Sequence, residues 1–391
     1  MREAVIVSAV RTPLGNFNGS LGSIGATKLG AMVIEEAVRR AGISKEDVNE
    51  VIMGMVLPCG YGQNPGKQAA VLAQMPWEVE AITINKVCGS GLKAVMLGAQ
   101  AIQTGDADVV VAGGMENMTL APFYLDKARA GYRMGDGTLY DHMVHDGLWD
   151  IVNDFHMGIS NELCSEKHNV TREDQDNYAV QSYARTLASI AAGKFKAEIM
   201  PVPVPSRKGE PVLFSQDECP RETSYEALSK MRPAFKKDGV TTAGNASIIS
   251  DGAAAVVVMA REKAEAMGCR IMATIGAQAS YGIDMKYVLV APIWAIPKCL
   301  KKEGLTLNDV DLFEINEAFS GSTVAVLKTL ELDPTKVNVN GGSVSLGHPI
   351  GASGCRVLVT LVHEMNRQDK KVGLASLCLG GGEAVAMVVK R

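Results

Sequence analysis

Residues 41–54 read AGISKEDVNEVIMG, and residues 303–316 read EGLTLNDVDLFEIN. Each stretch has the pattern of a helix that closes at a glycine, a polar turn that contains Asp-Val, and a short strand. Two such similar stretches, so far apart in one chain, indicate an internal repeat. A repeat says more about the overall architecture of a chain than any single motif does.

The similarity continues downstream in the same order. Residues 82–85 and residues 337–340 each read as a strand that leads into a glycine-rich turn and a helix, and residues 107–114 match residues 372–378 as a last strand. Short apolar runs alternate with helical patterns, which is typical of parallel strands joined by crossover helices. The sequence therefore predicts a duplicated α/β fold packed in layers.

A more polar segment, residues 120–245, separates the two copies and is interpreted as an insertion rather than a linker. Within it a helix is predicted from Thr171, whose hydroxyl can cap the chain together with Asp174, as far as Gly193. Residues 251–259 then return to a buried strand that rejoins the first half's sheet. The predicted domains are residues 1–119 with 246–270, the insertion 120–245, and residues 271–391.

Charge and composition exclude several classes of protein. The formal net charge is −4, which gives no electrostatic footprint for nucleic acid or an anionic membrane. The first residues resemble a strand and not a signal peptide, and no apolar run is long enough to span a bilayer, so a cytoplasmic location is expected. The eight cysteines contain no Cys-x-x-Cys pair, which argues against a zinc site or disulfide framework, and no metal is predicted.

Cys88 lies in Val87-Cys-Gly-Ser-Gly91, between a predicted strand and a predicted helix. Amide groups and the helix dipole at such a position are expected to lower the pKa of a thiol and favour the nucleophilic thiolate. A strand, a glycine-rich turn and a helix also describe phosphate loops and purely structural turns, so Cys88 alone does not identify a reaction.

Three more polar groups follow predicted strands of the second half. His348, in a glycine-rich turn before a proline, could remove a proton from a facing thiol, although a structural histidine is the ordinary alternative. Asn316 follows residues 312–315, and Cys378 precedes the glycines 380–382, whose amides could bind an oxyanion. Because ligands of α/β sheets bind at the carboxyl edge, these groups are expected to converge with Cys88.

These motifs resemble the four signature blocks of the thiolase family: Val-Cys88-Gly-Ser-Gly, Asn316-Glu-Ala-Phe, Gly-His348-Pro-Ile-Gly-Ala-Ser-Gly and Cys378-Leu-Gly-Gly-Gly. The resemblance covers practically the whole chain. It extends to features of the short bacterial acetyl-CoA acetyltransferases, namely His156-Met-Gly and Pro-Ala-Phe235 in the insertion. It implies duplicated βαβαβαββ domains packed in layers, with an α/β loop-domain insertion that binds coenzyme A.

The resemblance also implies roles for individual residues. Cys88 would take the acyl group after activation by His348, and Cys378 would exchange a proton with the methyl carbon of a second acetyl-CoA. His348 and a water on Asn316 would form one oxyanion hole, and the amides of Cys88 and Gly380 the other. Coenzyme A thioesters would be substrates, with no added cofactor. The implied coenzyme A and acyl contacts are Ser247, Leu148, His156, Met157, Phe235 and Phe319, with Arg221 as a phosphate contact.

Three functions remain open at this point. The first is acetyl-CoA C-acetyltransferase, an acyltransferase that condenses two acetyl-CoA to acetoacetyl-CoA or catalyses the reverse cleavage. The second is a 3-ketoacyl-CoA thiolase of broader or altered chain specificity, and the third is a thiolase-fold scaffold subunit with little activity of its own. By analogy with the family, the chain is expected to form a homodimer or homotetramer.

The sequence departs from the family pattern at two places. Relatives commonly carry Met-Gly-x-Gly-Pro where this chain has residues 288–292, VLVAP, so that Leu289 and Ala291 replace glycines. Residues 248–251, IISD, replace the usual Gly-Leu-Asn-Asp. Leucine and β-branched residues add bulk and stiffness where glycine would permit close approach, so either a reshaped substrate pocket or a compensated loop with ordinary specificity is expected.

Overall fold

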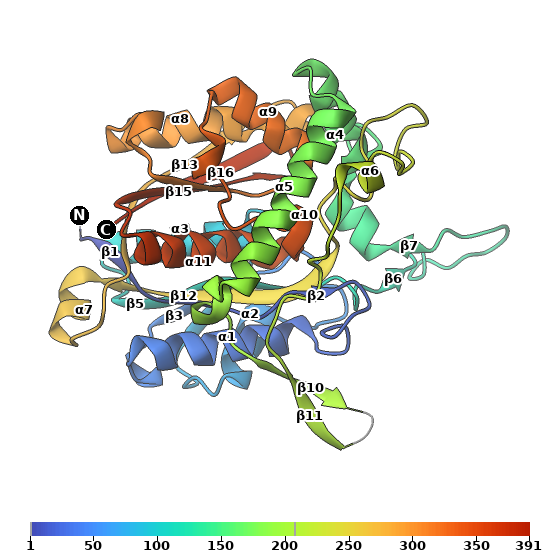
Figure 1. Ribbon diagram of the computed structural model, residues 1–391. Coiled ribbons are helices and arrows are strands. Elements are labelled where there is room, and N and C mark those ends of the chain that lie inside the picture. The colour runs from blue at the N-terminus through green and yellow to red at the C-terminus, as the bar shows by residue number, and fades with distance from the viewer. Residues whose placement is uncertain (1, 207–208) are drawn as a thin grey trace.

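The apolar runs form one mixed sheet in the computed structural model, which describes residues 2–206 and 209–391 (Figure 1). Its main path runs β14 (Leu312–Ile315), β15 (Val372–Leu379), β16 (Glu383–Lys390), β13 (Ala273–Gly282), β1 (Ala4–Arg11), β12 (Ser250–Ala260), β5 (Val109–Asn117), β3 (Glu50–Gly54) and β4 (Glu80–Ile84), and β2 (Gly15–Asn16) pairs with β12.

Each half of the chain contributes one part of this sheet, and within residues 2–206 and 209–391 the two parts are joined where Val5 pairs with Thr274 and Ile6 with Ala273. The expectation of parallel strands is correct for β3 with β4 and β5, and for β14 with β15. The other strand pairs are antiparallel. In the case of β15 and β16 the reason is the tight connection through residues 380–382, because a short loop can join only antiparallel neighbours.

Helices cover both parts of the sheet, and one helical layer lies between them (Figure 1). That central layer consists of α3 (Ser90–Thr104) and α11 (Ile350–Gln368). Of the 19 residues of α11, 15 are buried, which is the pattern of a helix enclosed on all sides. The outer layers are α1 (Ala26–Ala41) and α2 (Pro65–Leu72) on one side, and α8 (Pro292–Glu303) and α9 (Ser320–Leu330) on the other.

The internal repeat is confirmed in three dimensions. Helices α1 and α8 both end at a left-handed glycine, Gly42 and Gly304. Each is followed by a 3-10 turn with a capping box, built by Ser44 in one copy and Thr306 in the other. Strands β3 and β14 come next, as the repeat predicts.

One predicted strand is wrong. Residues 337–340 form only isolated bridges, because Asn338 has a φ of 47° and interrupts the extended backbone. The side chain of Asn338 takes the place of the backbone partner that Ile315 would have in a neighbouring strand. Its Oδ1 accepts from the amide of Ile315 at 2.8 Å, and its Nδ2 donates to the carbonyl of Ile315 at 2.8 Å.

The inserted residues connect β5 to β12. The predicted helix is α5 (Arg172–Ala191), with Thr171 and Asp174 in the predicted capping box, and β12 rejoins the sheet between β1 and β5 as expected. None of the helices in residues 2–206 and 209–391 is both long and apolar enough to cross a bilayer. The remaining elements are β6 (Phe123–Tyr124), β7 (Tyr140–Asp141), a π-helix (Met143–Leu148), β8 (Trp149–Asp150), β9 (Phe155–His156), α4 (Met157–Lys167), 3-10 helix Lys194–Ala197, β10 (Val202–Ser206), β11 (Gly209–Phe214), α6 (Tyr225–Leu228), α7 (Arg261–Ala266), 3-10 helices Met285–Val290 and Pro334–Lys336, and α10 (Ser343–Leu346).

A buried ion-pair cluster ties the insertion to β1. Arg11 is fully buried and donates from Nε to Glu198 at 2.6 Å and from Nη1 and Nη2 to Asp217 at 2.6 and 2.9 Å. Asp217 also accepts from the amide of Leu14 at 2.8 Å. Removing one partner of such a cluster leaves an uncompensated buried charge.

We expect Asp217→Ala to lower the free energy of unfolding by about 3–5 kcal/mol, because Arg11 would lose its bidentate partner inside the protein. Thermal unfolding of the variant measures this loss. Glu35→Ala on helix α1, which removes an exposed ion pair with Lys45, is the control and should leave the melting temperature nearly unchanged. A melting temperature for Asp217→Ala equal to that of the control would contradict this account.

Candidate active site

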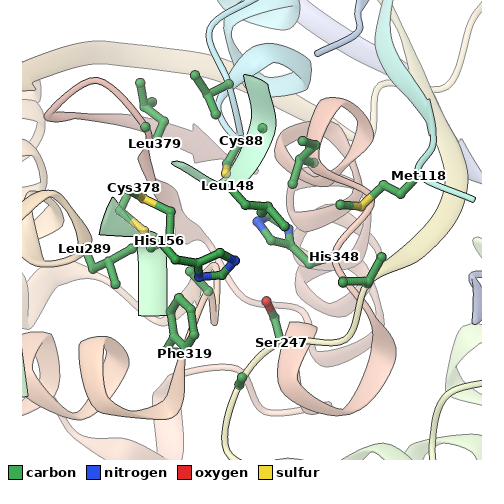
Figure 2. A pocket seen from close by; sticks show the side chains of 18 of the residues that line it. Cys88, Met118, Leu148, His156, Ser247, Leu289, Phe319, His348, Cys378 and Leu379 are labelled. Carbon is green, nitrogen blue, oxygen red and sulfur yellow. The ribbon is translucent and has the colours of Figure 1, made fainter. Parts of the chain in front are cut away.

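A mostly apolar cavity of about 270 Å³ lies where both halves and the insertion meet (Figure 2). The side chains of Cys88, His348 and Cys378 point into it. The lining residues are Val87, Cys88, Met118, Gly147, Leu148, His156, Met157, Phe235, Ala246, Ser247, Ile248, Ile249, Leu289, Ala318, Phe319, His348, Ile350, Cys378, Leu379 and Gly380.

The turn between β4 and α3 presents Cys88 to this cavity. Ser90 holds the turn, since its Oγ accepts from the amide of Lys86 at 2.8 Å and donates to the carbonyl of Val87 at 2.6 Å. Val87 has a φ of 45°, which is rare for a β-branched residue and costs about 1–3 kcal/mol. The hydrogen bonds of Ser90 keep this strained conformation and thereby fix the direction of Cys88.

Two glycines bring Cys88 and His348 together. A Cβ atom on Gly91 would lie 2.7 Å from the backbone nitrogen of Cys355, and one on Gly354 would collide with the backbone nitrogen of Leu92. The first turns of α3 and α11 are therefore in backbone contact. Cys88 and His348 each precede the first residue of their helix by two positions, so this contact places both at the same cavity.

His348 is held as a neutral base. Ser353 Oγ donates to the carbonyl of Pro349 at 2.8 Å and accepts from His348 Nδ1 at 2.7 Å, so Nδ1 carries the proton and Nε2 the lone pair. Asn316 Nδ2 lies 3.4 Å from this Nε2. Burial, and secondly the charge of Arg356, lower the pKa of His348 to about 3, which keeps the imidazole neutral.

The expectation of a lowered pKa for Cys88 is wrong. Burial in the apolar cavity raises the pKa of its thiol to about 12, although hydrogen bonds from the amides of Gly380 and of Cys88 itself act in the opposite direction. Both amides therefore lie beside the sulfur, and their role as an oxyanion hole for an acyl group on Cys88 stays a prediction. Cys88 is thus a neutral thiol at rest and needs a base to become a nucleophile.

The second cysteine lies close to the first. Cys378 is buried near the end of β15, and burial followed by the proximity of Cys88 raises the pKa of its thiol well above the usual range. Two thiols and one neutral imidazole at one cavity can move a proton between sulfur and nitrogen, and between sulfur and a substrate carbon.

The structure gathers most of the predicted binding residues at this cavity. Six line it: Leu148, His156, Met157, Phe235, Ser247 and Phe319. The His156 ring stacks on Phe235 with centroids 4.7 Å apart, and Phe235 meets Phe319 edge-on at 6.2 Å. Arg221 is not among the lining residues. It is exposed, with its guanidinium 5.2 Å from the centroid of the Tyr183 ring, and its predicted contact with a phosphate stays a prediction.

Sequence reasoning missed two serines that act on the site through other residues. Ser353 sets the tautomer of His348, and Ser343 donates from Oγ to Asn316 Oδ1 at 2.7 Å. Ser353 was available inside the histidine motif, one helical turn after Pro349, but its contact depends on the geometry of the first turn of α11. Nothing in the sequence pattern marks Ser343. In the part of the chain that the structure describes, no three His, Cys, Asp or Glu side chains gather as a metal site.

Comparison with known proteins agrees with this geometry. Residues 4–262 match the model of the thiolase N-terminal domain, and residues 269–391 match that of the thiolase C-terminal domain.

The chain belongs to the thiolase family.

Its relatives include "Acetyl-CoA acetyltransferase" of Pseudomonas aeruginosa, 53% identical over 392 residues, and the protein of the same name from Escherichia coli, 53% identical over 393 residues; both alignments cover the whole of both chains. A crystal structure of the Bacillus anthracis acetyl-CoA acetyltransferase superposes with a TM-score of 0.98 at 41% identity, covering 100% of this chain and 99% of that one. The duplicated thiolase-like α/β fold predicted from the sequence is confirmed.

Not all of the residues that depart from the thiolase pattern lie at the cavity. Leu289 lines the cavity and packs in the same hydrophobic cluster as Cys378, whereas Ala291 is buried and is not part of the lining. Ile248 and Ile249 also line the cavity. Of the two residues that replace glycine, only Leu289 therefore reduces the space available to an acyl chain.

We expect Leu289→Gly to raise kcat/KM for longer or branched 3-ketoacyl-CoA thioesters, relative to acetoacetyl-CoA, by roughly tenfold or more, because the cavity would gain the volume of the leucine side chain. Steady-state kinetics on a series of thioesters of increasing chain length measures this ratio. Ala291→Gly is the matched control and should leave it unchanged. An unchanged ratio in Leu289→Gly would show that the loop is compensated and specificity ordinary.

Proposed function

We propose that this thiolase is an acetyl-CoA C-acetyltransferase, which condenses two acetyl-CoA to acetoacetyl-CoA and coenzyme A or catalyses the reverse thiolytic cleavage. The observation that carries the proposal is the convergence of Cys88, His348 and Cys378 at one cavity, with Asn316 beside the imidazole. The names of the full-length relatives support the same activity.

In the first half of the proposed reaction, His348 Nε2 takes the proton of Cys88 as the sulfur attacks the acetyl carbonyl. The amides of Cys88 and Gly380 stabilise the oxyanion of the tetrahedral intermediate. The intermediate collapses to acetyl-Cys88 and coenzyme A thiolate, which takes a proton from Cys378. The products of this half are acetyl-Cys88, an imidazolium on His348 and a thiolate on Cys378.

In the second half, the Cys378 thiolate removes a proton from the methyl carbon of a second acetyl-CoA. The protonated Nε2 of His348 donates to the resulting enolate oxygen, and Asn316 places a further donor beside it. The enolate carbon attacks acetyl-Cys88, the carbon–carbon bond forms, and the expelled Cys88 thiolate takes back the proton from His348. All three side chains return to their starting state, so the cycle requires neither a metal nor an added cofactor.

Two features favour this activity over the alternatives. The aromatic and aliphatic walls of Phe235, Phe319 and Leu289 leave a cavity of about 270 Å³, which suits a short acyl group better than a long one. The complete set of thiol, imidazole and amide groups is unnecessary in a scaffold subunit, whose task would be binding alone.

All eight cysteines are free thiols, which supports a reducing, cytoplasmic location.

Acetyl-CoA alone should acetylate Cys88, because acyl transfer precedes and does not need the second substrate. Cys88→Ser should lose both this label and turnover. Cys378→Ser should keep the label, since a coenzyme A thiolate can leave without a proton donor, but should lose carbon–carbon bond formation. Intact-mass analysis and peptide mapping measure the label, and acetylation of Cys378 instead of Cys88 in native protein would reverse the two roles.

We also propose that the protein assembles as a homodimer or homotetramer. Strand β4 ends the sheet, and an edge strand with apolar exposed residues is a site for pairing. Ile82 on β4 is 45% exposed and the nearby Trp77 is 77% exposed. A second apolar surface lies on the projecting β6–β7 arm (Figure 1), where Phe123 and Leu139 are each 59% exposed.

Light scattering at micromolar concentration should therefore give at least twice the 41.5 kDa mass of one chain. Ile82→Lys should shift the mass toward that of a monomer, because it places a charge on the proposed edge contact. Lys28→Glu, on an exposed face of α1, is a control that should leave the mass unchanged. A native mass of 41.5 kDa would end the proposal.

A further inference from the structure

Ser343 lies between the buried guanidinium of Arg356 and the side-chain amide of Asn316. It is the first residue of the short helix α10 and is fully buried. Its Oγ lies 2.7 Å from Asn316 Oδ1 and 3.3 Å from Nη2 of Arg356, which is 1% exposed on α11. Asn316 Nδ2 in turn lies 3.4 Å from His348 Nε2. The four side chains thus form one continuous series of contacts.

The direction of each hydrogen bond in this series follows from the chemistry of the groups. An arginine can only donate, so Ser343 Oγ accepts from Arg356. Ser343 then has one hydroxyl hydrogen, and Asn316 Oδ1 is the acceptor within reach. Since a serine that donates must face an oxygen, the oxygen of the Asn316 amide faces Ser343 and its nitrogen faces His348.

The other end of the series gives the same orientation independently. Ser353 donates to the Pro349 carbonyl, so it can only accept from His348, and His348 Nε2 carries a lone pair. A lone pair attracts the amide nitrogen of Asn316 and would repel its oxygen. Arg356 reinforces the arrangement: among the described residues its Nε and Nη1 have no hydrogen-bond partner, Nη1 lies 3.9 Å from Glu314 Oε2 in a long ion pair, and Nη2 donates to Ser343.

We propose that Ser343, held by Arg356, is a positioning residue that locks the Asn316 amide with its N–H groups toward His348 and the cavity. The role rests on the proposed thiolase function and deepens it. In the enolate half of the reaction, a locked amide presents a donor to the developing negative charge. An amide free to rotate would present its oxygen part of the time, and an oxygen there repels an oxyanion.

The same helix supplies a matched control. Ser345 is also fully buried on α10, and its Oγ lies 3.0 Å from Ser182 Oγ and 2.7 Å from Thr186 Oγ1. Its hydrogen bonds do not reach Asn316. Ser343→Ala and Ser345→Ala each remove one buried hydroxyl from one helix, so an effect due only to packing or stability should appear in both variants.

The experiment compares Ser343→Ala, Ser345→Ala and Ser343→Thr with native full-length protein. It measures melting temperature, acetylation of Cys88 by acetyl-CoA, and kcat and KM for acetoacetyl-CoA cleavage and for condensation. Ser343→Ala should lower kcat by about tenfold or more, with KM within about twofold and Cys88 acetylation retained, because removal of one oxyanion donor costs about a hundredfold or more and a misoriented one costs less. Ser343→Thr, which keeps the hydroxyl, should restore kcat.

Ser345→Ala should lose a similar amount of thermal stability but keep nearly native kcat. If Ser343→Ala does not fold, Ser343→Cys, which keeps the side-chain shape with a weaker donor, should show the same selective loss. Native kcat in the Ser343 variants, or an equal loss of kcat in Ser345→Ala, would overturn the positioning role alone. Native protein that neither acetylates Cys88 nor turns over would overturn the proposed function, and this role with it.

Discussion

The backbone contact between the first turns of α3 and α11 is the constraint on which the site depends. Gly91 and Gly354 allow it, because a Cβ atom at either position would meet backbone atoms of the other helix. Both helices are enclosed between the two parts of the sheet, so neither can tilt away without opening the core. Because these helix ends are in contact, the turn that carries Cys88 and the turn that carries His348 form a single site.

Burial then determines the charge state of that site. Raising the pKa of Cys88 from 9.0 to about 12 corresponds to about 4 kcal/mol against the thiolate. A helix N-terminus contributes typically about 0.3–1 kcal/mol in its favour, and about 2 kcal/mol in favourable buried geometries. Desolvation is the larger effect, so the resting pair is a neutral thiol and a neutral imidazole, and charge appears only when the substrate carbonyl and its hydrogen-bond donors are in place.

The sequence was sufficient for features that depend on local patterns or on repetition. The repeat at residues 41–54 and 303–316 predicted two similar α/β halves, Thr171 predicted the start of α5, and the motifs around Cys88, His348 and Cys378 predicted one shared cavity. It failed where a contact between distant residues decides the outcome. Asn338 replaces a strand by bonding Ile315, the surroundings of Cys88 reverse the expected pKa shift, and the orientation of Asn316 depends on Ser343 and Arg356.

The placement of Cys88 and His348, each two residues before a helix of a different half, also sets the smallest piece of the chain that can hold the site. Neither half contains both groups, so a fragment that ends at the boundary between them would fold, at best, into a protein that has Cys88 without its base, or His348 and Cys378 without the nucleophile. Two halves made as separate chains would have to associate before the nucleophile met its base. Duplication within one chain supplies both groups in equal amounts and removes the need for them to find each other in solution.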